Sequence, residues 1–409
     1  MITTPAPIET VPRAAWRMLG LGVAAQAAGT LLVSTPAYLI PLLHVERGLP
    51  LAEAGLLAAA PTFGLVLTLV LWGALADRVG ERWVIAGGLA LAAVFALAAA
   101  TQQGIWPMAA LLVLGGAATG STNSSSGKIV AGWFPRSRRG LAMGIRQMSQ
   151  PLGVAVAALT VPPLADRYGP WAPLTLAGAL LAVLSVVCAF GIANAPNPAR
   201  TGAFSAEQQQ ALRANPYRED HFLARIHLVS ILLVVPQFTL STFGLVWLTS
   251  GQGARGWNAT VAGIVIAVAQ FAGALGRIAV GSASDRVGSR VRVLRWVAVS
   301  AVVVMLALAA SSLLDSAIVS GVVLVVATTV SVADNGLAFT SVAEAAGPGW
   351  SGRALGIQNT GQFVAASVVG PGVGALIAVV GYPVAFALVA ITPLLSVPVV
   401  PEGDHHRIG

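Results

Sequence analysis

Charged residues are scarce in this sequence. Asp, Glu, Lys and Arg together make up 9% of its 409 residues, whereas hydrophobic residues make up 56%. An ordinary soluble domain carries about 25% charged residues. A water-soluble fold with so few charges would expose large apolar patches, and such patches promote association. We therefore expect the surplus apolar side chains to face lipid.

Cysteine and catalytic motifs are also lacking. Cys188 is the single cysteine, so no disulfide can form within the chain. Neither a Gly-x-Ser-x-Gly elbow nor a pair of catalytic carboxylates is present. The five histidines form no catalytic or metal-binding group; they are His44, His221, His227, His405 and His406. The sequence thus predicts that the protein is not an enzyme and that it has no metal or cofactor site.

Lysine is nearly absent, although the chain is basic. Lys128 is the one lysine beside 22 arginines (23 − 1), and the formal net charge is +8. The arginines lie in short loops between apolar runs, without a basic helix or zinc-ligand spacing, so no nucleic-acid partner is expected. The positive-inside rule of membrane proteins explains the charge more simply.

Long apolar runs are what the sequence has in abundance. A helix that crosses a bilayer needs about 20 mostly apolar residues. Twelve such runs lie near residues 17–43, 51–76, 83–103, 106–131, 141–164, 171–193, 223–250, 259–281, 293–314, 316–343, 353–379 and 382–400. The first run is too long for the apolar region of a cleaved signal peptide, so we expect it to be retained. The predicted fold class is an all-α membrane protein with twelve transmembrane helices.

One polar segment divides these runs into two sets of six. Residues 195–222 form this segment, which predicts an N-terminal six-helix half at 1–194, a cytoplasmic linker, and a C-terminal six-helix half at 223–409. If the N-terminus is cytoplasmic, few arginines fall in the outer loops; they are Arg47, Arg167 and Arg255. This asymmetry predicts a multi-pass protein of the cell membrane with both termini in the cytoplasm.

The second half repeats the first in the same order. GALADRVGER at 73–82 recurs as GSASDRVGSR at 281–290, a displacement of 208 residues (281 − 73). GIRQMSQ at 144–150 matches GIQNTGQ at 356–362, a displacement of 212 residues (356 − 144). Because six helices are an even number, both copies have the same orientation in the membrane. Parallel repeats related by an axis along the membrane normal are a known transporter design.

The repeated loop carries a motif in which a glycine is followed by Asp-Arg and then by Gly-x-Arg. Its residues are Gly73, Asp77, Arg78, Gly80 and Arg82 in the first copy and Gly281, Asp285, Arg286, Gly288 and Arg290 in the second. The motif resembles the signature loop between helices 2 and 3 of the major facilitator superfamily, and the resemblance covers nearly the whole chain. It implies a monomeric secondary transporter that works by alternating access. In that family this loop is a cytoplasmic gate between the halves and not a substrate site.

A few polar side chains lie inside the predicted spans, where they are costly and are therefore candidates for function. Arg146 is the candidate anion anchor, because a guanidinium group binds a carboxylate or phosphate bidentately. The alternative is an arginine that reaches back to the membrane interface. Gln150 lies four residues further along the same helix face. The repeat places Gln358 at the position equivalent to Arg146.

Further polar side chains are candidates for the lining of a substrate cavity. Asn123 and Asn335 occupy equivalent positions in the two halves. The remaining candidates are Gln26, Tyr38, Gln237 and Gln270. The alternative for each of them is a hydrogen bond that holds two helices together.

Asp334 lies inside the tenth run and is the candidate for proton coupling. Burial disfavours the charged form of a carboxylate, so a buried aspartate can take up and release a proton. The alternative is a structural carboxylate that pairs with a helix end or an arginine. Arg277 and Glu344 lie nearer the ends of their runs and are expected to be structural.

These residues lead to a hypothesis about function. We expect transport of a small organic anion such as a carboxylate, by proton coupling or exchange, with the substrate, the proton and membrane lipid as partners. The alternative is a proton-coupled multidrug efflux pump that uses Asp334, although the helix-4 arginine and helix-5 glycine–proline pattern of drug antiporters are missing. A receptor that transports nothing is disfavoured, because a doubled gate is useful only if the halves move.

Overall fold

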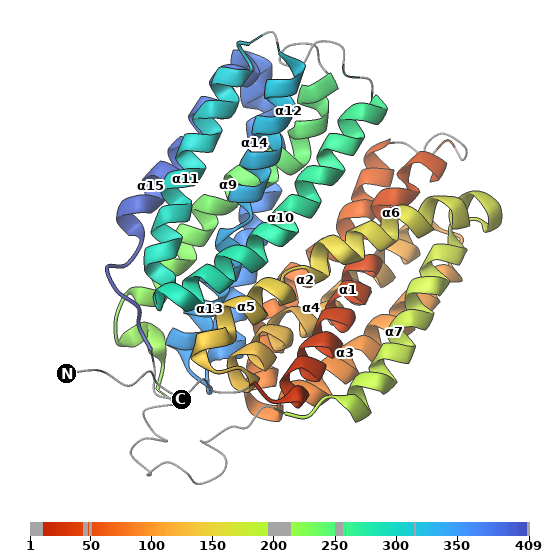
Figure 1. Ribbon diagram of the computed structural model, residues 1–409. Coiled ribbons are helices and arrows are strands. Elements are labelled where there is room, and N and C mark those ends of the chain that lie inside the picture. Colours follow the sequence, from red (N-terminus) through yellow and green to blue (C-terminus); the bar gives the residue numbers. More distant parts are fainter. Residues whose placement is uncertain are drawn as a thin grey trace.

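The protein folds into helices that form two bundles (Figure 1). The computed structural model describes residues 11–43, 48, 51–194, 214–249, 257, 259–314 and 316–406. No strand occurs in these ranges. Most of the predicted linker, and the loop arginines Arg47 and Arg255, lie outside the described residues.

Two sets of helices follow one another along the chain. The N-terminal half consists of α1 (Arg13–Pro41), α2 (Leu51–Val79), α3 (Glu81–Ala100), α4 (Ile105–Trp133), α5 (Arg136–Arg146), α6 (Ser149–Tyr168) and α7 (Trp171–Gly191). The C-terminal half consists of η2 (Pro216–Arg218), α9 (Phe222–Thr249), α10 (Ala259–Val287), α11 (Arg290–Ser311), α12 (Ala317–Ser331), α13 (Asp334–Ala346), α14 (Ser351–Val389) and α15 (Ile391–Val399).

Within the described ranges, 11 apolar helical segments are long enough to cross a membrane. The last of them, Ser351–Val399, has 49 residues, about twice what one crossing needs. Gly381 interrupts it with φ 75° and ψ 170°, a conformation that glycine adopts without steric cost. This segment therefore contains two crossings, and the prediction of twelve transmembrane helices is confirmed.

The fifth and tenth crossings are each broken near the middle, where the sequence predicted continuous helices. α5 ends at Arg146 and α6 begins at Ser149, while α12 ends at Ser331 and α13 begins at Asp334. Side-chain donors take up carbonyl groups next to the first break, since Ser149 Oγ donates to the Arg146 carbonyl (2.7 Å). Arg277 Nη1 donates to the carbonyl of the next residue (2.8 Å). An inserted side chain is a recognised cause of a helix break.

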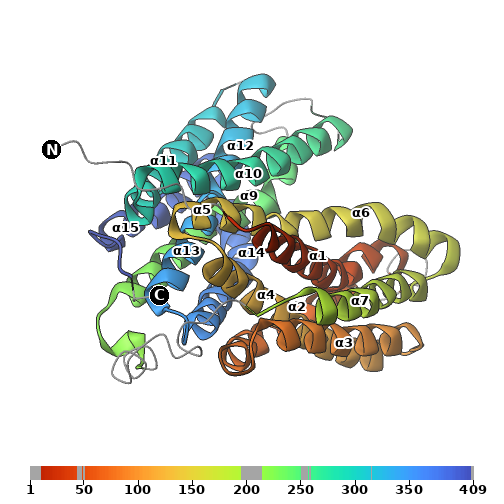
Figure 2. The same ribbon diagram turned by 60° about the horizontal axis from the view of Figure 1, so that its bottom comes forward.

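The two halves meet at one end of the molecule, which we call the base. The base is the end at which α1 begins and α15 ends. Figure 1 shows both bundles converging there and diverging toward the opposite end. Contacts between the halves run chiefly from α2 to α14 and from α5 to α10, whereas α6 packs on α1 and α7 of its own half. Figure 2 shows α5 beside α10 and α13.

One apolar cluster joins the halves at the base. Its members include Leu19, Phe134 and Met143 from the N-terminal half and Leu294 and Phe339 from the C-terminal half, each 3% exposed or less. Two other clusters lie within single halves. Large apolar side chains also cover the outer surface; among the most exposed are Leu159, Phe190 and Val379. Such a surface suits lipid, as the composition predicted.

Candidate functional site

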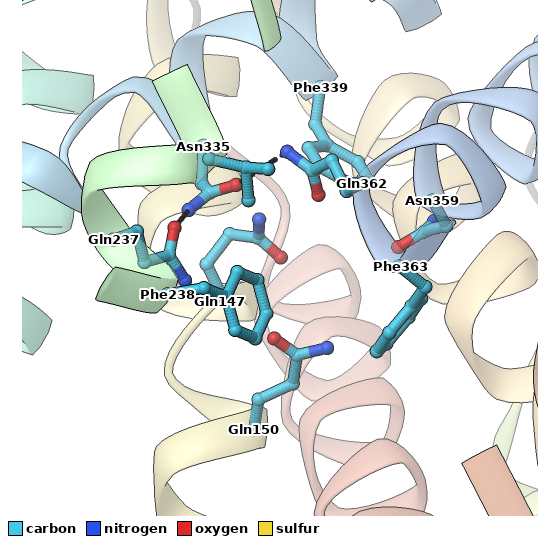
Figure 3. Close-up of a pocket in the computed structure, with 10 residues that line it drawn as sticks. Gln147, Gln150, Gln237, Phe238, Asn335, Phe339, Asn359, Gln362 and Phe363 are labelled. Carbon is cyan, nitrogen blue, oxygen red and sulfur yellow. Dashed lines mark hydrogen bonds between the residues drawn. The ribbon is translucent and has the colours of Figure 1, made fainter. Parts of the chain in front are cut away.

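A small polar cavity lies between the halves, at the level of the two helix breaks. Six carboxamide side chains and three phenylalanines dominate its wall (Figure 3). The lining residues are Gln147, Gln150, Val234, Gln237, Phe238, Asn335, Phe339, Asn359, Gln362 and Phe363. Its volume of about 30 Å³ holds a water molecule. An organic substrate needs these side chains to move apart.

Hydrogen bonds hold several of the carboxamides in place on the C-terminal side. Asn335, which directly follows the first residue of α13, donates through Nδ2 to Gln237 Oε1 (2.8 Å). Gln362 Nε2 donates to Asn335 Oδ1 (2.9 Å) and to Ser230 Oγ (2.7 Å). These bonds link α9, α13 and α14. They orient the amides as a fixed polar wall.

Arg146 lies directly behind this wall and is 1% exposed. Its Nε donates to Ser126 Oγ (2.9 Å), Nη1 to Gln147 Oε1 (2.8 Å) and Nη2 to the Asn123 carbonyl (2.5 Å). The guanidinium carbon is 5.2 Å from the centre of the Phe339 ring. No carboxylate of the described residues lies within 4.0 Å of this guanidinium. Two residues of the cavity wall, Gln147 and Phe339, therefore separate a buried positive charge from the cavity.

A second buried arginine approaches the same point from the C-terminal half. Sequence reasoning placed Arg277 near a helix end, but it lies ten residues before the end of α10 (287 − 277) and is 7% exposed. Its Nη1 donates to the Gln147 carbonyl, and its Nε has no hydrogen-bond acceptor among the described residues. Asp334 is within electrostatic range of Arg277 and is 1% exposed. Neither Asp334 carboxylate oxygen has a side-chain hydrogen-bond donor in the described part of the chain.

Nearer the base, the aspartate of each repeated loop contacts the opposite half. Asp77 accepts hydrogen bonds from the backbone N–H groups of Gly352 (2.9 Å) and Arg353 (3.1 Å) at the start of α14. Asp285 accepts them from Gly140 (3.0 Å) and from the next residue (2.9 Å) in α5. Gly352 and Arg353 lie in the first turn of α14, where the partial positive charge of a helix start favours a carboxylate. The two contacts are repeats of each other and tie the halves together.

Glycines allow the backbones to touch at both points. A Cβ atom on Gly73 would lie 2.1 Å from the Gly352 carbonyl oxygen. A Cβ atom on Gly281 would lie 2.2 Å from the Gly140 carbonyl oxygen. Neither separation is possible between real atoms, so a larger residue would force the two halves apart at the base.

Comparison with known proteins decides the family. The profile of the Major Facilitator Superfamily (MFS) matches residues 19–370. The chain belongs to this superfamily. It is 44% identical over 388 residues to an uncharacterized MFS-type transporter of Mycobacterium tuberculosis strain H37Rv, covering 95% of this chain and 85% of that protein. The resemblance seen in the repeated loop is thus confirmed, and the protein is a multi-pass MFS transporter.

Two more distant similarities accompany this match. The MFS chain is 25% identical over 280 residues to the 4-hydroxybenzoate transporter PcaK of Pseudomonas aeruginosa, covering 61% of each protein. The crystal structure of FucP, an MFS transporter in the outward conformation, matches with a TM-score of 0.74 at 15% identity. That match covers 95% of this chain and 99% of FucP. At this identity it concerns the fold.

The MFS transporter brings three of the predicted lining residues together in the cavity: Gln150, Gln237 and Asn335. The other candidates lie elsewhere, and one of them, Gln270, is exposed. Asn123 Oδ1 accepts a hydrogen bond from Gln26 Nε2 (3.0 Å), behind Arg146. Tyr38 is half-buried against the core of the N-terminal half. Arg146 is behind the wall as described, and Gln358 bonds to a histidine.

Sequence reasoning missed several lining residues that the repeat could have revealed. The displacement of 212 pairs Gln147 with Asn359 (359 − 147) and Gln150 with Gln362 (362 − 150). All four line the cavity. The wall is therefore built from the same positions of both halves. The three phenylalanines carry no such signal, because an aromatic residue in an apolar run looks the same whether it faces lipid or a cavity.

His227 is a buried polar group that the sequence did not single out. Its Nδ1 is hydrogen-bonded to Gln358 Oε1, and its Nε2 lies 2.9 Å from the Tyr217 hydroxyl. Burial raises the pKa of Tyr217 above its ordinary value, so this hydroxyl stays protonated and donates. The chain of contacts ties η2 and α9 to α14. Gln358 therefore has a bonding partner distinct from the cavity.

Five other motif residues turn the chain, form a contact within their own half or are exposed. Gly80 and Gly288 have φ values of 100° and 70° and turn the chain into the next helix. Arg82 Nε donates to the Ala189 carbonyl (2.6 Å) within the N-terminal half. Two motif arginines are exposed at the base: Arg78 and Arg286.

An ion network at the base adds to the contacts between the two halves. The Glu344 carboxylate lies 3.6 Å from Arg290, and 3.7 and 3.9 Å from Arg139 and Arg136 of the other half. His406, beyond the last crossing, lies 3.4 Å away, and burial lowers the pKa of His406. Arg290 also donates through Nη1 to Asp285 (2.6 Å). One buried carboxylate thus gathers basic groups from both halves.

Proposed function

We propose that this MFS transporter is a secondary active carrier of small organic carboxylates. The observation that carries the proposal is the charge beside the cavity. Arg146 and Arg277, one from each half, both donate to Gln147, and Asp334 is the one carboxylate near them in the described residues. A buried charge without a partner is unfavourable. An anionic substrate would balance the excess positive charge.

The cavity wall supports a carboxylate with a planar apolar body. Three phenylalanines offer apolar faces: Phe238, Phe339 and Phe363. The six carboxamides can orient a hydroxyl or similar polar group without adding charge. The relative PcaK is named as a 4-hydroxybenzoate transporter, and 4-hydroxybenzoate has this chemistry. An aromatic monocarboxylate is therefore the first substrate class to test.

Movement of the halves would carry the substrate across. The cavity is too small for an aromatic acid, and the halves are tied together at the base by Asp77 and Asp285. Rocking about the central cavity would open it to one side at a time. In proton-coupled transport, Asp334 is proposed as the carboxylate that takes up and releases the proton. In exchange, one substrate anion leaves as another enters, and no net proton movement is needed. We propose that the base is cytoplasmic, that the cell membrane holds the protein as a monomer, and that it transports without catalysis.

A binding assay tests the substrate class. A ligand that binds only the folded state raises the free energy of unfolding, by about 2.7 kcal/mol at 100 times its Kd, and so raises the apparent Tm. We expect benzoate or 4-hydroxybenzoate to raise the Tm of the detergent-purified protein, whereas benzamide, which lacks the charge, does not. Arg146→Gln should abolish the effect. Arg146→Lys should retain part of it, because lysine keeps the charge but not the planar fork.

Drug efflux is the second candidate, favoured by the phenylalanines and by the absence of charged side chains among the lining residues. In that case lipophilic cations, and no carboxylate, would raise the Tm, and Asp334→Asn would abolish the effect. Stabilisation by carboxylates in the Arg146→Gln variant would contradict the assigned anchor. Absence of flux with any stabilising ligand would contradict transport.

A further inference from the structure

We infer that Gln147 occupies the position on Arg146 at which the substrate carboxylate binds, which we call the seat, and that the substrate carboxylate displaces its side chain. This inference rests on the proposed function and deepens it, because it names the residue that competes with the substrate. The seat is the Nη1 side of the Arg146 guanidinium, where Gln147 Oε1 accepts a hydrogen bond of 2.8 Å. A carboxamide oxygen there has the position and acceptor character of a carboxylate oxygen, without the charge.

The rest of the seat is built in advance. Arg146 Nε donates to Ser126 Oγ and Nη2 to the Asn123 carbonyl, so α4 holds the plane of the guanidinium. Ser126 is itself fixed, because its hydroxyl donates to Gln26 Oε1 (2.9 Å). These bonds do not involve the cavity wall. The guanidinium would therefore keep its orientation when the Gln147 side chain leaves.

The Gln147 side chain is the movable part of this arrangement. It sits in the break between α5 and α6, and its carboxamide lies among the other cavity side chains in Figure 3. Its backbone is held at both polar groups, since its N–H donates to the Met143 carbonyl (3.0 Å) and its carbonyl accepts from Arg277. In the described part of the chain, the side chain has one hydrogen bond, the one from Arg146. It can rotate away without disturbing the backbone.

The Arg146 guanidinium has an acceptor at both stages of the cycle. A carboxylate adds a charge–charge attraction to this hydrogen bond that the neutral amide cannot supply, so a carboxylate would displace the amide. When the substrate leaves, the amide returns and keeps the buried guanidinium from losing an acceptor, which is costly. A neutral isostere of the substrate offers no such gain. The seat therefore selects for the anion.

The C-terminal half has the same positions without the seat. The repeat places Gln358 opposite Arg146 and Asn359 opposite Gln147. Gln358 bonds to His227, and Asn359 Nδ2 donates to the Leu355 carbonyl in its own helix (2.9 Å). The hydrogen bond between a guanidinium and a neighbouring carboxamide, Arg146 to Gln147, thus occurs only in the N-terminal one of these two equivalent positions. One carboxylate per transporter is expected to bind.

Substitution of Gln147 tests the inference. Gln147→Glu keeps the shape and places a tethered carboxylate on Arg146. We expect a higher Tm without ligand, and benzoate binding at least about tenfold weaker than in the wild type, corresponding to the loss of one charge-assisted hydrogen bond. Gln147→Ala removes the competitor and should tighten benzoate binding several-fold. Gln150→Glu adds the same charge to the same cavity without an arginine contact, and should not raise the Tm.

The outcomes separate this inference from the proposed function. If neither benzoate, 4-hydroxybenzoate nor an aliphatic carboxylate stabilises the wild type, the proposed function fails and the seat fails with it. If a carboxylate stabilises the wild type and the Gln147→Glu variant equally, the seat alone is wrong. A rise in Tm without ligand that is the same in Gln150→Glu and Gln147→Glu would also overturn it, because the gain would not come from Arg146.

Discussion

At the residue scale, the buried charges in the middle of the membrane divide into two kinds. Arg146 is satisfied by neutral acceptors. Asp334 has no ion pair within 4.0 Å and no side-chain hydrogen-bond donor in the described residues, although Arg277 is near enough to interact with it. A carboxylate so placed is costly when charged. This makes Asp334 the residue whose protonation is easiest to couple to movement.

Asp334→Asn is expected to separate coupling from transport. An amide cannot take up or release a proton, so uptake driven by a pH gradient should fall by at least about tenfold. Exchange of labelled for unlabelled substrate needs no net proton movement and should continue. Both are measured in proteoliposomes with the carboxylate found by the Tm screen. Asp166→Asn, at the exposed end of α6, is the matched control. Uphill uptake unchanged in Asp334→Asn would exclude the coupling role.

At the element scale, closure of the base depends on how closely two pairs of helices approach. α2 meets α14 at Gly73, and α10 meets α5 at Gly281. Each contact combines an aspartate that accepts backbone N–H groups of the opposite half with a glycine that leaves room for the backbone. The aspartate forms hydrogen bonds to the opposite half, and the glycine, which has no side chain, lets the two backbones come into contact. Neither alone explains why the halves are closed at the base.

Gly73→Ala combined with Gly281→Ala is expected to open the base. Each added Cβ would lie about 2 Å from a carbonyl oxygen, so both helix pairs must separate. Spin labels are attached to cysteines introduced at Arg78 and Arg286, both exposed at the base, in a variant without the native Cys188. Double electron–electron resonance should then report a longer distance between the two labels. Gly87→Ala in α3 meets no atom within 4 Å and is the control. It should leave the distance unchanged and cost no stability, because alanine favours helix over glycine by about 1 kcal/mol. An unchanged distance in the double variant would refute the gate.

At the scale of the whole molecule, the arginines of the motif and of the Glu344 network gather at one end. The base carries the motif arginines and the arginines of the Glu344 network. Arg167 lies in the last turn of α6, at the opposite end of the molecule. The membrane rule for positive charge concerns the loops near the ends of spans. The distribution therefore predicts a cytoplasmic base.

Reporter fusions test this orientation. A fluorescent protein that folds only in the cytoplasm should be bright when fused to either terminus. Alkaline phosphatase, which is active only outside the cytoplasm, should be inactive there and active when inserted at Gly169, between α6 and α7. Reversing the charge bias, by moving arginines from the base to the loop at Gly169, should reduce this difference. Phosphatase activity at both termini would show that the base faces outward.

Much of the fold could be predicted from the sequence, because each crossing is an apolar run of defined length. The breaks in the fifth and tenth crossings could not. At the first of them a freed carbonyl is bound by Arg277 of another helix, and the sequence does not mark that contact. Arg277 illustrates the same limit. Its position along the chain favoured a structural role near a helix end, but packing buries it against Gln147 of the other half.

The sequence by itself determined the membrane location, the twelve crossings, the repeat and the family, because these follow from local composition and from motifs that recur at a constant displacement. The tertiary structure alone decided which polar groups share a cavity. Gln150, Gln237 and Asn335 come together there, while Tyr38 and Gln358 do not. The reason is physical: the face that a helix turns toward its neighbours depends on packing between the halves, and in a run that is apolar on every side the sequence does not mark that face.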